Sequence, residues 1–157
     1  MLLVLTVFHT FVSLIGIVAG FVAVLVLARG VYAERWNLTF LVTTILTSAS
    51  GFLFPLVKLL PSHIVGIASL VVLAIAVLAR YAFKLGGGWR PTYAVTATTA
   101  LWFNIFVLVA QLFQKVPFLK ASAPTQTEPP FAIAQVCMLV VCVLLGIGAV
   151  RGKKRVA

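Results

Sequence analysis

Five long stretches without a charged residue limit what this chain can fold into. Each is about 20 residues or longer, which is the length of helix that crosses the hydrocarbon core of a bilayer. Of the 157 residues, 63% are hydrophobic and 9% are charged, whereas soluble domains average about 45–50% apolar and about 25% charged residues. So little polar surface cannot shield a single core from water. The pattern predicts an integral membrane protein.

The expected fold is all-α, an integral membrane bundle of five transmembrane helices in one domain covering residues 1–157. The expected spans cover about residues 2–28, 37–57, 62–83, 92–114 and 130–150. Only Lys58 and the Pro61-Ser62 turn separate the second span from the third, which predicts a tight hairpin. The alternative is four spans with one re-entrant or interfacial helix. The first apolar stretch is much longer than that of a signal peptide, so it is expected to remain as a span.

The basic residues fall mainly on one side of the expected bundle. Nine Lys and Arg residues lie on the side of the C-terminal tail RGKKRVA, and three lie on the other side, namely Lys58, Lys115 and Lys120. The positive-inside rule therefore predicts an outer N-terminus and a cytoplasmic C-terminus. This explains the net charge of +10 without nucleic acid as a partner. Membrane lipids are expected partners, since the basic tail can contact anionic head groups.

Small and polar residues recur at helical spacing on four of the five spans. On the first span, His9, Ser13, Gly16 and Gly20 share one face. The two glycines form a G-x-x-x-G pattern, which is typical of close helix packing in membranes. These stripes predict a compact bundle. Assembly into a homo-oligomer, or with another membrane protein, stays open.

Both histidines and several amides are expected near the outer end of the bundle. His9 lies within the first span, and His63 opens the third. Gln111, Gln135 and Glu128 lie near the same side. The inner half is expected to hold no comparable group apart from its flanking cations. Because polar groups inside a membrane are functional candidates by default, His9 and His63 are the predicted cofactor-binding residues, with Gln111, Gln135 and Glu128 as weaker members.

Three classes of function fit this pattern. The main interpretation is an accessory or structural membrane component without chemistry of its own. The alternative is a redox-linked membrane protein in which His9 and His63 bind haem b or a quinone. The third is a small oligomeric transporter or channel, although no Asp or Glu lies inside an expected span to relay protons. No Ser–His–acid set or metal-ligand spacing occurs, so catalytic residues and a metal site are not expected.

Three segments carry a resemblance to other proteins. They are FHTFVSLIGIVAG, PSHIVGI and the stretch FVLVAQLFQKVPFLKASAPTQTEPPF (Phe106–Phe131). Over nearly the whole chain the sequence resembles a group of small multi-pass bacterial membrane proteins of unknown function. The resemblance implies a bacterial inner membrane. It implies no activity, cofactor or residue role.

Overall fold

The computed structural model describes residues 2–54 and 61–152, with the backbone alone for residues 61–63. Within these residues the chain is helical and contains no strand, so the predicted all-α class is confirmed. The elements are α1 (Leu2–Ala28), α2 (Glu34–Gly51), α3 (Pro61–Val77), the π-helix η1 (Leu78–Ala82) that continues α3, α4 (Trp89–Lys115), α5 (Pro117–Ser122) and α6 (Pro129–Arg151).

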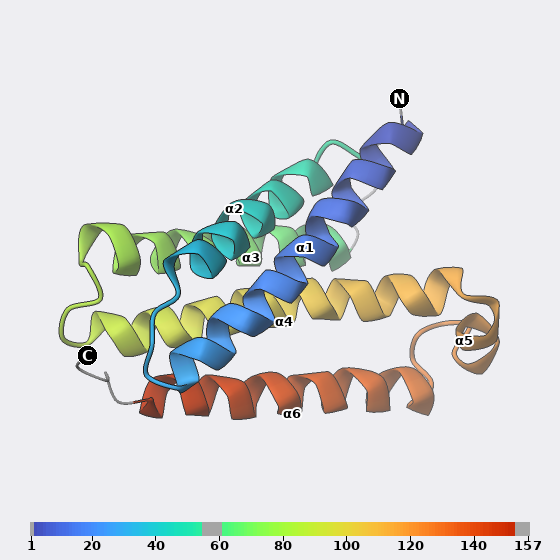
Figure 1. Ribbon diagram of the computed structural model, residues 1–157. Coiled ribbons are helices and arrows are strands. Elements are labelled where there is room, and N and C mark those ends of the chain that lie inside the picture. Colours follow the sequence, from blue (N-terminus) through green and yellow to red (C-terminus); the bar gives the residue numbers. More distant parts are fainter. Residues whose placement is uncertain (1, 55–60, 153–157) are drawn as a thin grey trace.

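The long helices alternate in direction along the chain (Figure 1). The amino ends of α1, α3 and α6 and the carboxyl ends of α2 and α4 lie together, on the right of Figure 1. We call this the Lys115 end, and the opposite one, where α6 finishes, the Arg151 end. Helix α6 packs on α1 and α4, whereas α2 and α3 lie on the other side of the bundle.

Four of the described helices are long and apolar enough to cross a membrane. They cover Leu2–Ala28, Ile64–Ala82, Trp89–Lys115 and Pro129–Arg151. Helix α2 has 18 residues, close to the 19 of Ile64–Ala82, but it is more polar, because it contains Glu34, Arg35, Asn37 and six threonine and serine residues. It starts before the expected residue 37 and ends before the expected residue 57, and residues 55–57 lie outside the described ones. The expectation of five spans is therefore not confirmed.

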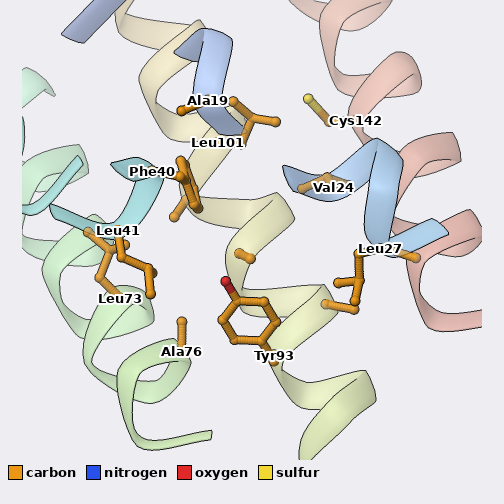
Figure 2. Close-up of a cluster of buried hydrophobic side chains, with 14 of the residues drawn as sticks. Ala19, Val24, Leu27, Phe40, Leu41, Leu73, Ala76, Tyr93, Leu101 and Cys142 are labelled. Carbon is orange, nitrogen blue, oxygen red and sulfur yellow. The ribbon is translucent and has the colours of Figure 1, made fainter. Parts of the chain in front are cut away.

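The centre of the bundle is a close-packed apolar core to which α1, α2, α3, α4 and α6 contribute side chains (Figure 2). Phe40, Tyr93 and Leu101 are fully buried there, each 0% exposed. Such packing drives helix association in lipid, where the hydrophobic effect between helices is absent. This core lies between the Lys115 end and the Arg151 end of the bundle.

The glycines of the predicted packing stripe allow α1 to approach its neighbours closely. A Cβ atom at Gly20 would lie 2.8 Å from Leu101 Cδ1 and from the Phe40 ring. A Cβ atom at Gly16 would lie 3.0 Å from the Thr43 hydroxyl. Both glycines are buried, so the interpretation of G-x-x-x-G as a packing face is confirmed.

Candidate functional site

A cavity of about 490 Å³ lies among α1, α2, α3 and α4 at the Lys115 end. Along α4 its lining runs from Asn104 to Lys115, about 16 Å of helix. Asn104 is buried, with 7% of its surface exposed, and Lys115 is exposed. The cavity therefore opens at the bundle end and reaches toward the middle of the helices. Its volume lies within the range of about 300–1,000 Å³ that is usual for small-molecule sites.

Helix α1 brings His9 to one wall of the cavity. Ser50 Oγ lies 3.1 Å from the Thr47 carbonyl, to which its hydroxyl can donate, and 2.9 Å from His9 Nδ1. When the serine hydroxyl donates to the Thr47 carbonyl, His9 Nδ1 is the donor of the second bond. The Phe54 ring contacts the imidazole edge to face, with 5.4 Å between centroids. A neutral imidazole with its proton on Nδ1 keeps a lone pair on Nε2. His9 therefore offers an acceptor or ligand atom at the cavity wall.

Two hydrogen bonds join the helices at the floor of the cavity. Asn104 Nδ2 donates to the Thr44 hydroxyl at 3.2 Å and ties α4 to α2. Ser48 Oγ donates to Ser69 Oγ at 3.1 Å and ties α2 to α3. These bonds position the polar floor, because each joins two helices that also line the cavity.

Several hydroxyl groups of the cavity lack a partner among the described residues. Thr47 is 7% exposed, and its hydroxyl is buried without a hydrogen bond. Thr10 and Ser13, which also line the cavity, donate to no described atom. Threonines in apolar helices ordinarily donate to a carbonyl one turn earlier, as Thr43 and Thr98 do here. Thr47 differs from these threonines because its hydroxyl is buried at the cavity without a bond to a described residue. Tyr32 Oη, at the Arg151 end, is the other buried hydroxyl without such a bond among the described residues.

The structure brings together only part of the predicted site. His9 and Gln111 line the same cavity. His63 lies in the first turn of α3, but its side chain is outside the described residues. Gln135 and Glu128 do not line this cavity: Gln135 donates to the Phe106 carbonyl between α6 and α4 at 3.1 Å, because α6 packs on the far side of α4.

Glu128 organises the loop before α6. Its carboxylate accepts hydrogen bonds from the backbone N–H and hydroxyl of Thr125, at 3.1 and 2.9 Å, and from the Thr127 N–H at 3.1 Å. Desolvation raises the pKa of Glu128, but these hydrogen bonds lower the pKa by more than desolvation raises it. The pKa of Glu128 therefore lies below its usual value. This carboxylate shapes the surface loop.

Lys115 is a cavity residue that sequence reasoning missed. It was counted only as a cation flanking a membrane span, yet it lines the mouth of the cavity on the last turn of α4. Its position one turn beyond Gln111 was the available signal, since residues four apart share a helix face. The mouth therefore combines a cation with an amide.

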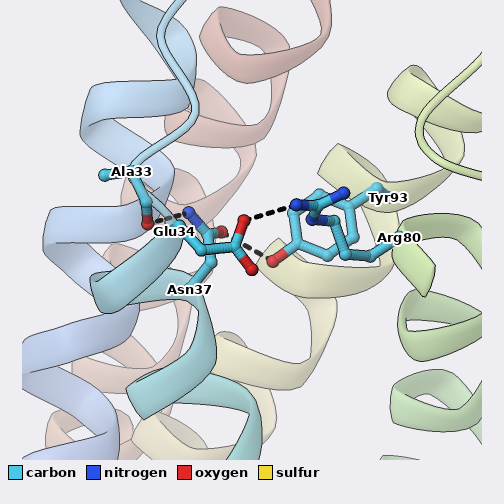
Figure 3. Close-up of polar contacts among 5 residues, drawn as sticks. All are labelled: Ala33, Glu34, Asn37, Arg80 and Tyr93. Atoms are coloured by element: carbon cyan, nitrogen blue, oxygen red, sulfur yellow. Dashed lines mark hydrogen bonds and ion pairs between the residues drawn. The ribbon is translucent and has the colours of Figure 1, made fainter.

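A polar network at the Arg151 end contradicts the expectation that the inner half holds only flanking cations (Figure 3). Tyr93 donates to Asn37 Oδ1 at 2.6 Å, and Asn37 Nδ2 donates to the Ala33 carbonyl at 2.7 Å. Arg80 forms an ion pair with Glu34. The pairing of Tyr93 with Asn37 joins residues 56 positions apart and has no local sequence signal.

Tyr32 adds an aromatic face to this network. The Arg80 guanidinium lies 4.5 Å from the centroid of the Tyr32 ring, a cation–π distance. Burial raises the pKa of the Tyr32 hydroxyl, so it stays protonated at neutral pH. The network joins the start of α2 to η1 and α4 and stabilises the Arg151 end.

No protein-family model, curated protein or solved structure matches this chain.

Proposed function

We propose that the chain spans a bacterial inner membrane with five helices, with the Lys115 end outside and the Arg151 end in the cytoplasm. The distribution of charge supports this orientation by the positive-inside rule. The described cations at the Arg151 end are Arg29, Arg35, Arg80, Lys84, Arg90 and Arg151, whereas Lys115 and Lys120 lie at the other end. Helix α2 serves as the fifth span because it is antiparallel to α1 and its polar side chains are buried in the bundle.

A reporter fusion tests this orientation. A phosphatase that is active only in the periplasm should be inactive when fused after Ala157. The same enzyme fused before the first residue should be active. The reverse result would overturn the orientation, and equal activity of the two fusions would overturn the odd number of spans.

We further propose that the cavity binds a lipid-like molecule whose head group bears hydrogen-bond-accepting oxygens. The supporting observation is the buried, unpartnered hydroxyl of Thr47 in the lining. Leaving such a group unpaired costs about 1–3 kcal/mol. The hydroxyls of Thr10 and Ser13 and the Gln111 amide, which have no bond to a described residue, can donate or accept, and the Lys115 ammonium can only donate. A head group rich in carbonyl or carboxylate oxygens would accept a hydrogen bond from each of these groups.

A quinone suits the cavity best among the expected ligands. Its ring is apolar, as are the lining side chains Leu14, Phe103 and Leu108, and its carbonyls accept hydrogen bonds. His9 Nε2 is an acceptor and would pair with the hydroxyl of the reduced form. We propose binding as the role, not catalysis, because the described lining offers no carboxylate beside His9. The protein is then an accessory component that holds or presents this molecule.

The Thr47→Val substitution tests the proposal. Valine has nearly the same shape and lacks the hydroxyl, so the affinity for a short-chain benzoquinone analogue should fall about tenfold, the effect of one hydrogen bond of about 1.4 kcal/mol. Thr43→Val is the matched control, because the Thr43 hydroxyl already donates to the Thr39 carbonyl on the same helix. Affinity is measured by titration of the detergent-purified protein. Equal affinities of wild type and T47V would overturn the proposal.

Haem is a second candidate because His9 retains an unprotonated Nε2, the kind of atom that ligates haem iron. A reduced-minus-oxidised absorption spectrum of the purified protein distinguishes the two. Sharp bands that disappear in His9→Ala would establish haem. A flat spectrum together with the T47V effect would establish the lipid-like ligand.

A further inference from the structure

A second hollow lies on the lipid-facing side of the bundle, between α4 and α6. It has a volume of about 390 Å³ and is lined mainly by apolar and small residues. Its floor includes Thr98 and Gly146, which pack closely: a Cβ at Gly146 would lie 3.3 Å from Thr98 Cγ2. Larger side chains, among them Trp102 and Val143, stand at its sides. We call this hollow the α4–α6 groove.

The length of the groove matches one leaflet of a bilayer. Its lining on α6 runs from Leu139 to Arg151, about 18 Å of helix. Half of a hydrocarbon core is about 15 Å. An acyl chain lying in the groove would therefore reach the membrane middle near Leu139 while its head group lies at the level of Arg151.

The Arg151 end has cations without matching acids. The whole chain contains two acidic residues. Glu34 is paired with Arg80, and Glu128 lies at the opposite end of the bundle. Arg151 therefore has no carboxylate side chain within reach to balance its charge.

Two further arginines lie near the carboxyl end of α6, although Arg151 is the arginine that lines the groove. The carboxyl end of α6 packs against that of α1, since a Cβ at Gly152 would lie 2.7 Å from the Leu27 and Ala28 carbonyls. Arg29 follows Ala28 directly, and the Arg90 guanidinium lies 3.5 Å from the Leu27 carbonyl. Arg29, Arg90 and Arg151 thus lie at the same end of the bundle, and Arg151 lies at the groove itself.

We propose that the α4–α6 groove binds an anionic phospholipid, with one acyl chain between the helices and the phosphate on Arg151. Basic pockets between membrane helices are known to hold anionic head groups. Apolar surface alone would accept any lipid, whereas Arg151, which lines the groove and has no carboxylate side chain to balance it, selects an anionic one. The site is separate from the cavity at the Lys115 end and does not depend on the ligand proposed there.

The test titrates the detergent-purified protein with dioleoylphosphatidylglycerol or dioleoylphosphatidylcholine and counts bound lipids by native mass spectrometry. Phosphatidylglycerol should bind more tightly to the wild type. Arg151→Gln should weaken its binding about fivefold, the effect of one basic residue near an anionic surface, with Lys120→Gln as the control at the other end.

A second pair of variants tests whether an acyl chain lies in the α4–α6 groove. Val143→Trp fills the groove and should weaken binding of both lipids, whereas Val140→Trp should not. Both valines are on α6 and 49% exposed, but only Val143 lines the groove. Equal binding of both lipids, or no effect of R151Q and V143W, would overturn the proposal. So would a dimer that V143W dissociates, because a second copy would then occupy the groove.

Discussion

Both ends of this bundle contain buried polar side chains, but the two ends differ in how these side chains are hydrogen-bonded. At the Arg151 end, Asn37 is bonded through both its oxygen and its nitrogen, and the Tyr93 hydroxyl has an acceptor. At the Lys115 end, Thr47 is equally buried, yet its hydroxyl has no partner within the described chain. A membrane interior penalises unpaired donors heavily. Tyr32 Oη and Arg80 Nε at the Arg151 end are also buried without a hydrogen bond to a described residue, but there the Arg80 guanidinium packs on the Tyr32 ring, whereas Thr47 lines a cavity. The Arg151 end is therefore filled by contacts between its own side chains, and the cavity at the Lys115 end is where a ligand would restore a missing bond.

The largest effect on stability is expected at the Arg151 end. Asn37→Leu removes the acceptor of the buried Tyr93 hydroxyl and should lower the free energy of unfolding by about 2 kcal/mol. Asn104→Leu at the cavity floor breaks one longer bond and should cost about 0.6 kcal/mol. Unfolding of both variants in mixed detergent gives the two values. If N104L cost as much as N37L, the distinction between the ends would be wrong.

A smaller loss is expected from the ion pair at the Arg151 end. Glu34 is half exposed, with 50% of its side-chain surface accessible, so Glu34→Gln should cost less than about 1 kcal/mol. The loss should shrink at high ionic strength, because salt screens exposed charges. Unfolding at low and high salt measures this. A loss independent of salt would mean that Glu34 acts through packing and not through its charge.

No loss of stability is expected from Thr47→Val when no ligand is bound. The hydroxyl has no partner to lose, and removing it relieves a buried unpaired group. The matched change Thr43→Val breaks a bond to the Thr39 carbonyl and should be slightly destabilising. Thermal unfolding of the delipidated protein compares them. A clear loss of stability in T47V would show that its hydroxyl is bonded in the folded protein.

The smallest effect is local and concerns the loop before α6. Because the pKa of Glu128 is lowered in the folded chain, its carboxylate stabilises the loop above the ordinary glutamate pKa of about 4.3, and this contribution disappears as the pH falls through the lowered value. Glu128→Gln should therefore speed amide exchange at Thr125 and Thr127 at neutral pH. Exchange measured by mass spectrometry should be unchanged in α1. Unchanged rates in the loop would contradict the hydrogen bonding of this carboxylate.

The helices and their packing faces were predictable because they depend on local patterns. Apolar length predicted the extent of α1, α4 and α6, and small-residue spacing predicted the close approach of Gly16 and Gly20. Helix α2 was extended too far in the prediction, because its apolar run continues past Gly51, where the helix ends. Local patterns do not give that end, since residues 52–54 are at least as apolar as the helix before them.

The candidate site was predictable in part. His9 and Gln111 converge because both lie near the same end of inward-facing helices. Gln135 was expected to join them, but helix order around the bundle places α6 against the other side of α4. The pairing of Tyr93 with Asn37 likewise depends on how α2 and α4 rotate against each other. The position of a residue along its helix can be counted from the sequence. The rotation of the helix about its axis, which decides the neighbour that a side chain faces, is set by packing.

The most direct test of the central claim is to identify what the purified protein retains in its cavity. Wild type and T47V, purified in the same mild detergent, are extracted with organic solvent, and the released molecules are compared by mass spectrometry. The account predicts one lipid-like molecule with carbonyl or carboxylate oxygens that is abundant in wild type, retained in T43V and depleted in T47V. Identical extracts from all three proteins would contradict it.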